Sequence, residues 1–468
     1  MPFGSVTERA QLPLVVGALA ICAAAAFARA VIPSVSEGPG GLGGATPIRP
    51  GPSLTLGVTR AFRLWTAGGF LFAVVVALQL LPLPNPLLGA LSPESLRLWS
   101  AAERVASLAG VATPEGSHPL SIDPQTTTVH LFRLLAYIAT FLAAALLMRR
   151  HRHRHALAFV LGATAVFETL YGIREAALQR YAIWGWVNKL IFNRVTGTFV
   201  NPNHFAHYAA IVLPLGVYLA AQEWHDAAPS GVPWRRRIVR LFEKRFLRFV
   251  FGVIVAFACI VAILVAQSRG GLVAAVAGFA IVGAIASGRR HALWRGLLIG
   301  VAGVAFAIVL ALLLGLKVSR FQDPEVASLG GRAVPLKTAF DLWKRFPLFG
   351  TGLGTFIDVS SMTGAGDVTH VINHAHDDYA EIAATTGVVG LLVALVPFLA
   401  GYVALVRMTF GARAAELSWT RRAYQAAALT SLAIAAVHAL IDFNFFIPAN
   451  PATLAAIAGT AVAIRDSR

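Results

Sequence analysis

The sequence predicts an all-α, polytopic integral membrane protein. Of its 468 residues, 57% are hydrophobic and only 13% are charged, and the mean hydropathy is +0.69. Apolar runs of about 20 residues recur along the chain, which is the length that crosses a bilayer as a helix. Because hydrocarbon offers backbone groups no hydrogen-bond partner, such runs fold as helices, and the alternating pattern of a membrane barrel is absent.

Eleven apolar runs are the candidate spans. Their Ala, Gly, Leu and Val content suits close helix packing. The runs fall near residues 12–32, 67–83, 129–148, 156–173, 204–222, 249–267, 271–287, 296–316, 383–406, 423–441 and 451–464. A further crossing within the Gly/Pro-rich stretch 33–66 would bring the N-terminus to the same side as the C-terminus. We therefore expect eleven or twelve spans in a single membrane domain, residues 1–468.

Clusters of Lys and Arg predict the orientation. They lie at residues 149–155, 234–248, 288–296 and 421–422. Short basic loops stay in the cytoplasm, so much of the formal net charge of +17 reflects topology. Because the clusters are scattered over separate connectors, they do not indicate a nucleic-acid partner. The "HRHRH" alternation is expected to be a solvated cytoplasmic face rather than a metal site.

The other connectors then share the opposite side, which is the periplasm of a Gram-negative cell. They are residues 84–128, 174–203, 268–270, 317–382 and 442–450. The longest, 317–382, contains "KTAFDLWKRF", a candidate amphipathic helix between Gly- and Pro-rich turns, so we expect an ordered periplasmic loop. Cys22 and Cys259 both lie within apolar runs, so neither a disulfide nor a cysteine metal site is expected.

Three arginines stand out on the outer side, where positive charge is disfavoured: Arg194, Arg269 and Arg332. Arg269 lies in a very short turn between two spans, where an unpaired guanidinium is costly. Guanidinium groups grip phosphate or pyrophosphate bidentately. We therefore expect an anion site at the outer face; the alternative is surface cations that tolerate the translocated side.

The segment "NHAHDDY", residues 373–379, precedes another span and carries His374, His376, Asp377 and Asp378. Three interpretations remain open. The cluster could cap the following helix, it could bind zinc or manganese, or it could perform acid–base chemistry. In the last case His376 takes a proton from a sugar hydroxyl and Asp377 orients the imidazole.

The segment Asn201-Pro202-Asn203 predicts a turn and an N-cap before a span. The cap accounts for Asn203. It does not account for His204 and His207, which are three residues apart and so face the same way near the outer end of the helix. They are either core histidines or part of the outer site.

Two further groups are polar but lie in or next to apolar runs. His438 and Asp442, four residues apart, share one helix face that approaches the outer surface. They either form a structural pair or line a polar site. Glu168 is a similar acid without an assigned partner. Intramembrane charges of this kind would also suit an ion-coupled transporter or flippase, although most polar residues gather at one face and no internal repeat is evident.

Four segments resemble, in order, the conserved blocks of the O-antigen ligase and polymerase superfamily: "RVTGTFVNPNHFAHYAAIVLPL", "AQSRGGLVAAVAGF", "GGRAVPLKTAFDLWKRFPLFGTGLGTF" and "HAHDDYAEIAATTGVVGLL". The resemblance covers about residues 190–450. Its most specific element is a histidine, a polar residue and, after nine positions, Gly-x-x-Gly. Here these are His376, Asp377, Gly387 and Gly390, with Asp377 where the family usually has Asn, Ser or Gln.

This resemblance implies a glycosyltransferase of the membrane-embedded GT-C type that needs no metal or other cofactor. Such an enzyme takes a glycan from undecaprenyl pyrophosphate at the periplasmic face of the inner membrane. By position, His376 matches the catalytic histidine, Arg194 and Arg269 match the arginines that hold pyrophosphate, and Arg332 is a weaker match. His374, Asn203 and His207 are expected to support the site.

The acceptor is open at this stage. The histidine and double-glycine motif favours a lipid A core sugar, the acceptor of a ligase. The segment "HALIDFNFFIPANP" resembles the tail of exopolysaccharide polymerases, whose acceptor is a second lipid-linked glycan. A protein hydroxyl, the acceptor of an O-oligosaccharyltransferase, is the third possibility.

Overall fold

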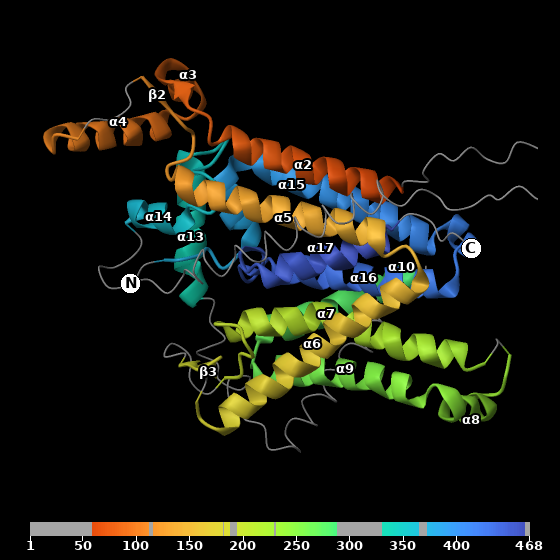
Figure 1. The fold of residues 1–468 in the computed structure, drawn as a ribbon. Helices are drawn as coiled ribbons and strands as arrows, with labels where there is room; N and C mark the ends of the chain where they lie inside the picture. The colour runs from red at the N-terminus through yellow and green to blue at the C-terminus, as the bar shows by residue number, and fades with distance from the viewer. Residues whose placement is uncertain are drawn as a thin grey trace, which may run out of the picture.

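The protein is a bundle of α-helices, as seen in a computed structural model that describes residues 59–111, 116–180, 182–187, 194–228, 231–287, 330–364 and 372–463 (Figure 1). Within these residues, seven helices are long and apolar enough to cross a membrane. They are α2 (Arg60–Leu78), α5 (Pro124–Leu147), α6 (His151–Ala177), α7 (Pro202–Asp226), α9 (Phe246–Val265), α10 (Arg269–Ser287) and α15 (Asp378–Phe410). The predicted class, an all-α polytopic membrane protein, is confirmed.

Two more helices, α16 (Trp419–His438) and α17 (Ala449–Ala461), complete the described bundle. Each of these nine helices coincides with one of the predicted apolar runs. The runs at 12–32 and 296–316 lie outside the described residues. The total of eleven or twelve spans therefore stays a prediction.

The short elements divide between the two ends of the bundle (Figure 1). At one end, which we call the basic end, lie α8 (Trp234–Lys244), η2 (Ala412–Glu416) and the basic connectors 149–155 and 421–422. The opposite end, here the outer end, carries the remaining small elements. They are β1 (Leu83–Pro84), α3 (Asn85–Leu91), α4 (Pro93–Leu108), β2 (Ser117–His118), β3 (Ala182–Ile183), β4 (Trp186–Val187), α13 (Gly330–Arg345), α14 (Phe356–Ser360), η1 (Ser361–Thr363) and η3 (Asn444–Phe446).

Side-chain caps explain where several helices begin. Thr59, Asp123, Asn201, Asp377 and Ser418 each accept a hydrogen bond from a backbone N–H in the first turn of α2, α5, α7, α15 and α16. Helix α7 has a cap within the predicted segment, but Asn203, to which the sequence assigned the cap, does not make it. The cap is made by Asn201, which accepts from the N–H of Asn203 at 2.8 Å, so the side chain of Asn203 is left for another contact.

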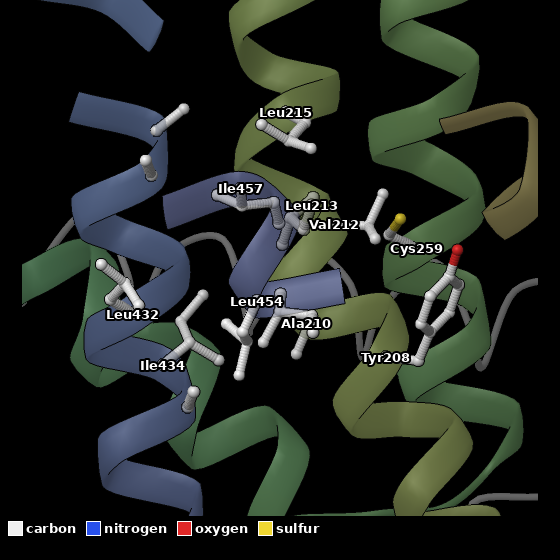
Figure 2. Packing of buried hydrophobic residues seen from close by; sticks show 14 of the residues in the cluster. Tyr208, Ala210, Val212, Leu213, Leu215, Cys259, Leu432, Ile434, Leu454 and Ile457 are labelled. Atoms are coloured by element: carbon white, nitrogen blue, oxygen red, sulfur yellow. The ribbon is translucent and has the colours of Figure 1, made fainter. Parts of the chain in front are cut away.

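Helix α7 lies at the centre of the bundle, and 83% of the residues in its most apolar stretch are buried. It packs against α9, α16 and α17, and Figure 2 shows Ala210, Val212 and Leu215 facing these neighbours. The backbones of α7 and α9 approach closely at Gly252, which has no side chain. A Cβ added there would lie only 2.4 Å from the Ala220 nitrogen. This rigid centre carries the outer residues His204 and His207 on its first turns.

Helix α15 is broken at Gly387, whose φ of 67° and ψ of −174° are essentially restricted to glycine. A Cβ there would lie 2.1 Å from the Leu348 carbonyl oxygen. The N–H groups of Val388 and Val389 donate to the carbonyls of Pro347 and Leu348 instead of continuing the helix. The first glycine of the predicted motif thus lets the loop after α13 dock into α15.

The described parts of the loop 317–382 are ordered by a small apolar cluster of their own. Leu342 of α13, Phe356 and Val359 of α14, and Ala375 and Ala384 are all buried together. Helix α13 contains the amphipathic segment predicted at "KTAFDLWKRF" and begins several residues before it. This cluster holds the segment that precedes α15 in place at the outer end.

Candidate active site

His376 lies directly before α15 and has a left-handed backbone with a φ of 55°. The conformation is fixed on its C-terminal side, where Asp377 caps α15 by accepting from the Ala380 N–H at 2.9 Å. The N–H of Asp378 donates to the carbonyl of Ala439 at 2.8 Å, which ties this turn to the end of α16. The His376 side chain is 34% exposed, so it is accessible to a substrate.

Asp442 is the carboxylate that His376 meets. Nδ1 of His376 lies 3.4 Å from Oδ1 of Asp442, a long hydrogen bond of the kind that tightens when substrate binds. Because a carboxylate only accepts, Nδ1 carries the proton and Nε2 presents its lone pair. Burial opposes ionisation of Asp442, yet the hydrogen bond from His376 and the neighbouring histidines hold the pKa of its carboxyl well below its usual range.

Asp442 also lies near His204 and Arg332, of which Arg332 was a predicted site residue. Its side chain is fully buried one turn beyond the end of α16, where its N–H donates to the His438 carbonyl. His204 Nε2 lies 3.9 Å from Oδ1, and an Arg332 Nη atom lies 3.9 Å from Oδ2. Three segments distant in sequence, α7, α13 and the turn before α15, therefore meet at one carboxylate.

Arg194 is held beside the start of α7. Its Nε donates to the Ala266 carbonyl at 2.9 Å and an Nη atom donates to Oδ1 of Asn203 at 2.8 Å. Asn203 is the neighbour of His204, which lies beside Asp442, so Arg194 is held close to the residues around Asp442. Ala266, which accepts from Arg194, lies in the turn between α9 and α10, three residues before Arg269.

Arg269 begins α10 after the short turn that the sequence predicts. The next residue, Gly270, packs on His438: a Cβ there would lie 2.9 Å from the imidazole Nε2. His438 in turn accepts the N–H of Asp442 through its carbonyl. Arg194, Arg269 and Arg332 are thus carried by segments that meet at the same outer ends of α7, α10 and α16.

Phe443 collects three of the histidines around one ring. His374 stacks on it with a centroid separation of 3.9 Å, and His204 and His376 meet it edge-on at 4.6 and 5.0 Å. His374 Nδ1 also lies 2.8 Å from the Glu381 carboxylate, whose other oxygen accepts the Ala375 N–H. His374 is therefore positioned beside His376 by α15 and by the segment after α16.

His207 lies one turn deeper in α7 and is fully buried. Its Nδ1 lies 2.9 Å from Nδ1 of His438, so one of the two rings donates and the other accepts. This pair joins α7 to α16 directly beneath the Asp442 cluster. His207 thus lies beneath the cluster without a contact to His376, and its supporting role stays a prediction.

One expectation is corrected by this geometry. The sequence assigned the orientation of His376 to Asp377, but Asp377 is a helix cap and Asp442 makes the contact. The i,i+4 spacing of His438 and Asp442 signals this role, since it predicts that both approach the outer surface. Glu168, which had no predicted partner, accepts from the N–H and hydroxyl of Thr198, each at 2.7 Å.

The three acids at the start of α15 make separate contacts. Asp378 accepts from the Phe445 N–H at 3.1 Å, Glu381 binds His374, and Asp377 caps α15. Among the described residues, no three His, Cys, Asp or Glu side chains are grouped so as to hold a metal ion.

Residues 254–395 match the family model described as O-antigen ligase. The resemblance to the O-antigen ligase and polymerase superfamily is confirmed. The matched part of the chain contains Arg269, Arg332 and His376, and it leaves out Arg194 and Asp442. It is shorter than the range of about 190–450 expected from the sequence. No curated protein is similar enough to the chain to count as a match.

Proposed function

We propose that the protein transfers a glycan from undecaprenyl pyrophosphate to an acceptor hydroxyl at the periplasmic face of the inner membrane. The observation that carries this proposal is the meeting at Asp442 of His376 and Arg332, with Arg194 and Arg269 on adjoining segments. An imidazole beside several guanidinium groups is what displacement of a pyrophosphate by a hydroxyl requires. The family match supports glycan transfer of this general kind.

In the proposed reaction the acceptor oxygen attacks the anomeric carbon opposite the leaving group. The new glycosidic C–O bond forms as the bond to pyrophosphate breaks, so the configuration inverts. The acceptor proton passes to Nε2 of His376, and Asp442 stabilises the imidazolium that results. Arg194, Arg269 and Arg332 stabilise the charge that develops on undecaprenyl pyrophosphate, each preorganised donor contributing about 3 kcal/mol. None of these steps uses a metal ion.

The acceptor in this proposal is a sugar of the lipid A core, as in a ligase. A polymerase would use a second lipid-linked glycan, and a protein O-oligosaccharyltransferase would use a protein hydroxyl. Cells lacking the chain distinguish these. Loss of a ligase leaves long glycans that are not on the core, whereas loss of a polymerase leaves single repeats.

An ion-coupled transporter has less support. Of the polar residues that suggested it, Glu168 holds the loop before α7, and His438 and Asp442 belong to the outer cluster. A transporter site would instead be expected near the bilayer midplane.

The test is an assay with purified protein, synthetic undecaprenyl-pyrophosphate-linked glycan, acceptor and EDTA. We expect transfer to persist with the chelator, and His376→Ala and Arg269→Ala each to lower the rate by about 100-fold or more. The matched control is Arg97→Ala, which removes an outer-end cation whose exposed ion pair with Glu94 lies on α4. No turnover by the unmodified protein with any acceptor, or full activity in either site variant, would refute the proposal.

A further inference from the structure

A pocket opens near the residues around Asp442 and Phe443, between α2, α5, α15 and the segment after α16. Its volume is about 190 Å³, and most of its lining is apolar, including Phe72, Phe445 and Phe446. None of Arg194, Arg269 and Arg332 lines it. The pocket is therefore separate from the place where those arginines are proposed to hold pyrophosphate.

The polar lining of this pocket comes from one helix, α5. An Nη atom of Arg133 donates to Nε2 of His130 at 3.1 Å. Since an arginine cannot accept, this histidine nitrogen is unprotonated and the positive charge belongs to the guanidinium. Arg133 lies nine residues after the start of α5 at Pro124, about 14 Å along the helix and thus inside the span. An arginine within a membrane span is costly and marks a candidate functional site, and the ligands that suit a guanidinium are anions.

Tyr137, one turn further along α5, lines the same pocket. Its hydroxyl is buried and makes no hydrogen bond within the described residues. A buried hydroxyl is usually satisfied, and a ligand oxygen reaching it would supply the partner. A guanidinium and a phenol surrounded by aromatic rings suit a phosphate carried on a hydrocarbon chain.

A series of aromatic rings connects the wall of the pocket to His376. Phe446 forms part of its wall and lies 5.7 Å from the ring of His374. His374 stacks on Phe443, and the imidazole of His376 meets the same Phe443 ring edge-on. Two rings thus separate the pocket from the candidate base.

We propose that this pocket holds the phosphate-bearing headgroup of a second lipid, the acceptor substrate. The inference rests on the proposed function, because transfer between two lipid-borne molecules needs two lipid sites that meet at one base. Arg133 binds the phosphate, Tyr137 donates to it, and the phenyl groups contact the adjoining hydrocarbon.

The test counts bound lipids by native mass spectrometry of the whole protein, using undecaprenyl phosphate as the probe of the donor site and lipid A as the probe of the pocket. The unmodified protein should retain two molecules, Arg133→Ala one, and Arg269→Ala one. The matched control is Phe132→Ala, which alters the neighbouring residue on α5, a side chain 52% exposed on the outside of the bundle. That variant should retain two. Inorganic phosphate should not displace the lipid from either site.

Equal retention by Arg133→Ala and the unmodified protein overturns the inference, and so does displacement by inorganic phosphate. If the unmodified protein retains a single lipid that only Arg269→Ala removes, the second site is refuted while the proposed function stands. The lipid remaining in Arg133→Ala reports that this variant is folded. Should it retain none, Arg133→Lys decides, because this charged variant must retain two molecules if the inference is correct.

Discussion

The backbone of His376 is held in a conformation that residues with a side chain rarely adopt. A φ of 55° costs about 1 kcal/mol relative to a right-handed residue. Two contacts impose it, the cap that Asp377 makes on α15 and the hydrogen bond from the Asp378 N–H to Ala439. This backbone conformation directs the imidazole toward Asp442. Such conformations are concentrated at active sites.

At the residue scale, we predict that Asp442→Asn lowers the transfer rate by about 100-fold or more, because an amide no longer fixes the imidazole tautomer or stabilises its charged form. Lipid retention by the variant should be unchanged, since the change keeps the side-chain shape. Initial rates over a range of donor concentrations measure this. A fall in donor affinity at an unchanged maximal rate would contradict the assigned role.

The lowered pKa of Asp442 adds a pH prediction. A carboxyl whose pKa falls on folding contributes stability at pH values above its unfolded pKa of about 3.9. That contribution is lost only as the pH falls toward the lower pKa of the folded state. Asp442 is therefore ionised throughout about pH 5.5–8. The carboxylate band of Asp442, identified by infrared difference between the unmodified protein and Asp442→Asn, should keep its ionised position over that range. A protonated carboxyl band appearing at the acidic end would show that Asp442 titrates there.

At the element scale, the break in α15 determines how the outer loop docks. The carbonyls of Ala384 and Thr385 accept from the N–H groups of Thr351 and Gly352, so the turn opened at Gly387 is satisfied by the loop. Gln79 reinforces the junction by donating to the Phe349 and Thr385 carbonyls. These bonds connect α2, the loop after α13 and α15 just beneath the catalytic segment.

We predict that Gly387→Ala destabilises the protein and lowers transfer, because a Cβ would meet the Leu348 carbonyl at 2.1 Å as well as strain the backbone. Gly364→Ala is the matched control, since Gly364 has a φ of 64° but nothing within 4 Å of the added Cβ. Thermal unfolding of both variants in detergent tests this. We expect a loss of roughly 1–3 kcal/mol for the backbone strain alone and more at Gly387. Equal melting temperatures for the two variants would argue against docking at this break.

Glu168 of α6 acts on the loop that carries Arg194. Its carboxylate accepts both the N–H and the hydroxyl of Thr198, which anchors the turn before α7. We predict that Glu168→Ala weakens donor binding by several-fold, because Arg194 loses the support of its loop. Comparing the donor KM and kcat of the variant tests this. A changed kcat at an unaltered KM would mean that Glu168 acts on something other than this loop.

At the scale of the whole molecule, charge and chemistry lie at opposite ends of the bundle. The basic helix α8 and the connectors around residues 149–155 and 421–422 share one end, and the candidate site is at the other (Figure 1). Because short basic loops stay in the cytoplasm, we propose that the site faces the periplasm. A lipid-linked glycan on the outer leaflet would reach it directly.

We predict opposite labelling of two engineered cysteines in intact spheroplasts. A membrane-impermeant maleimide should react with Leu108→Cys on α4, a position 90% exposed, and not with Val239→Cys on α8, which is 58% exposed. Both should react after the membrane is opened, which is the control for accessibility. Labelling of Val239→Cys in intact spheroplasts would reverse the proposed orientation.

The fold class and the position of most helices follow from the sequence because hydropathy is a local property. Nine described helices coincide with apolar runs, and the short turn before Arg269 lies where the sequence predicts it. What the sequence does not predict is contact between distant segments. It identified His376 and Asp442 separately, yet their pairing depends on how the end of α16 meets the start of α15. For the same reason Asn203 was predicted as part of a cap, and its bond to Arg194 was not.

Phe443 has a consequence for how this site can change. Its ring touches His204 from α7, and His374 and His376 from the segment before α15. A smaller side chain would release all three imidazoles together rather than retune one. Attempts to engineer a new acceptor preference should therefore leave this phenyl group untouched and alter the pocket wall on α5.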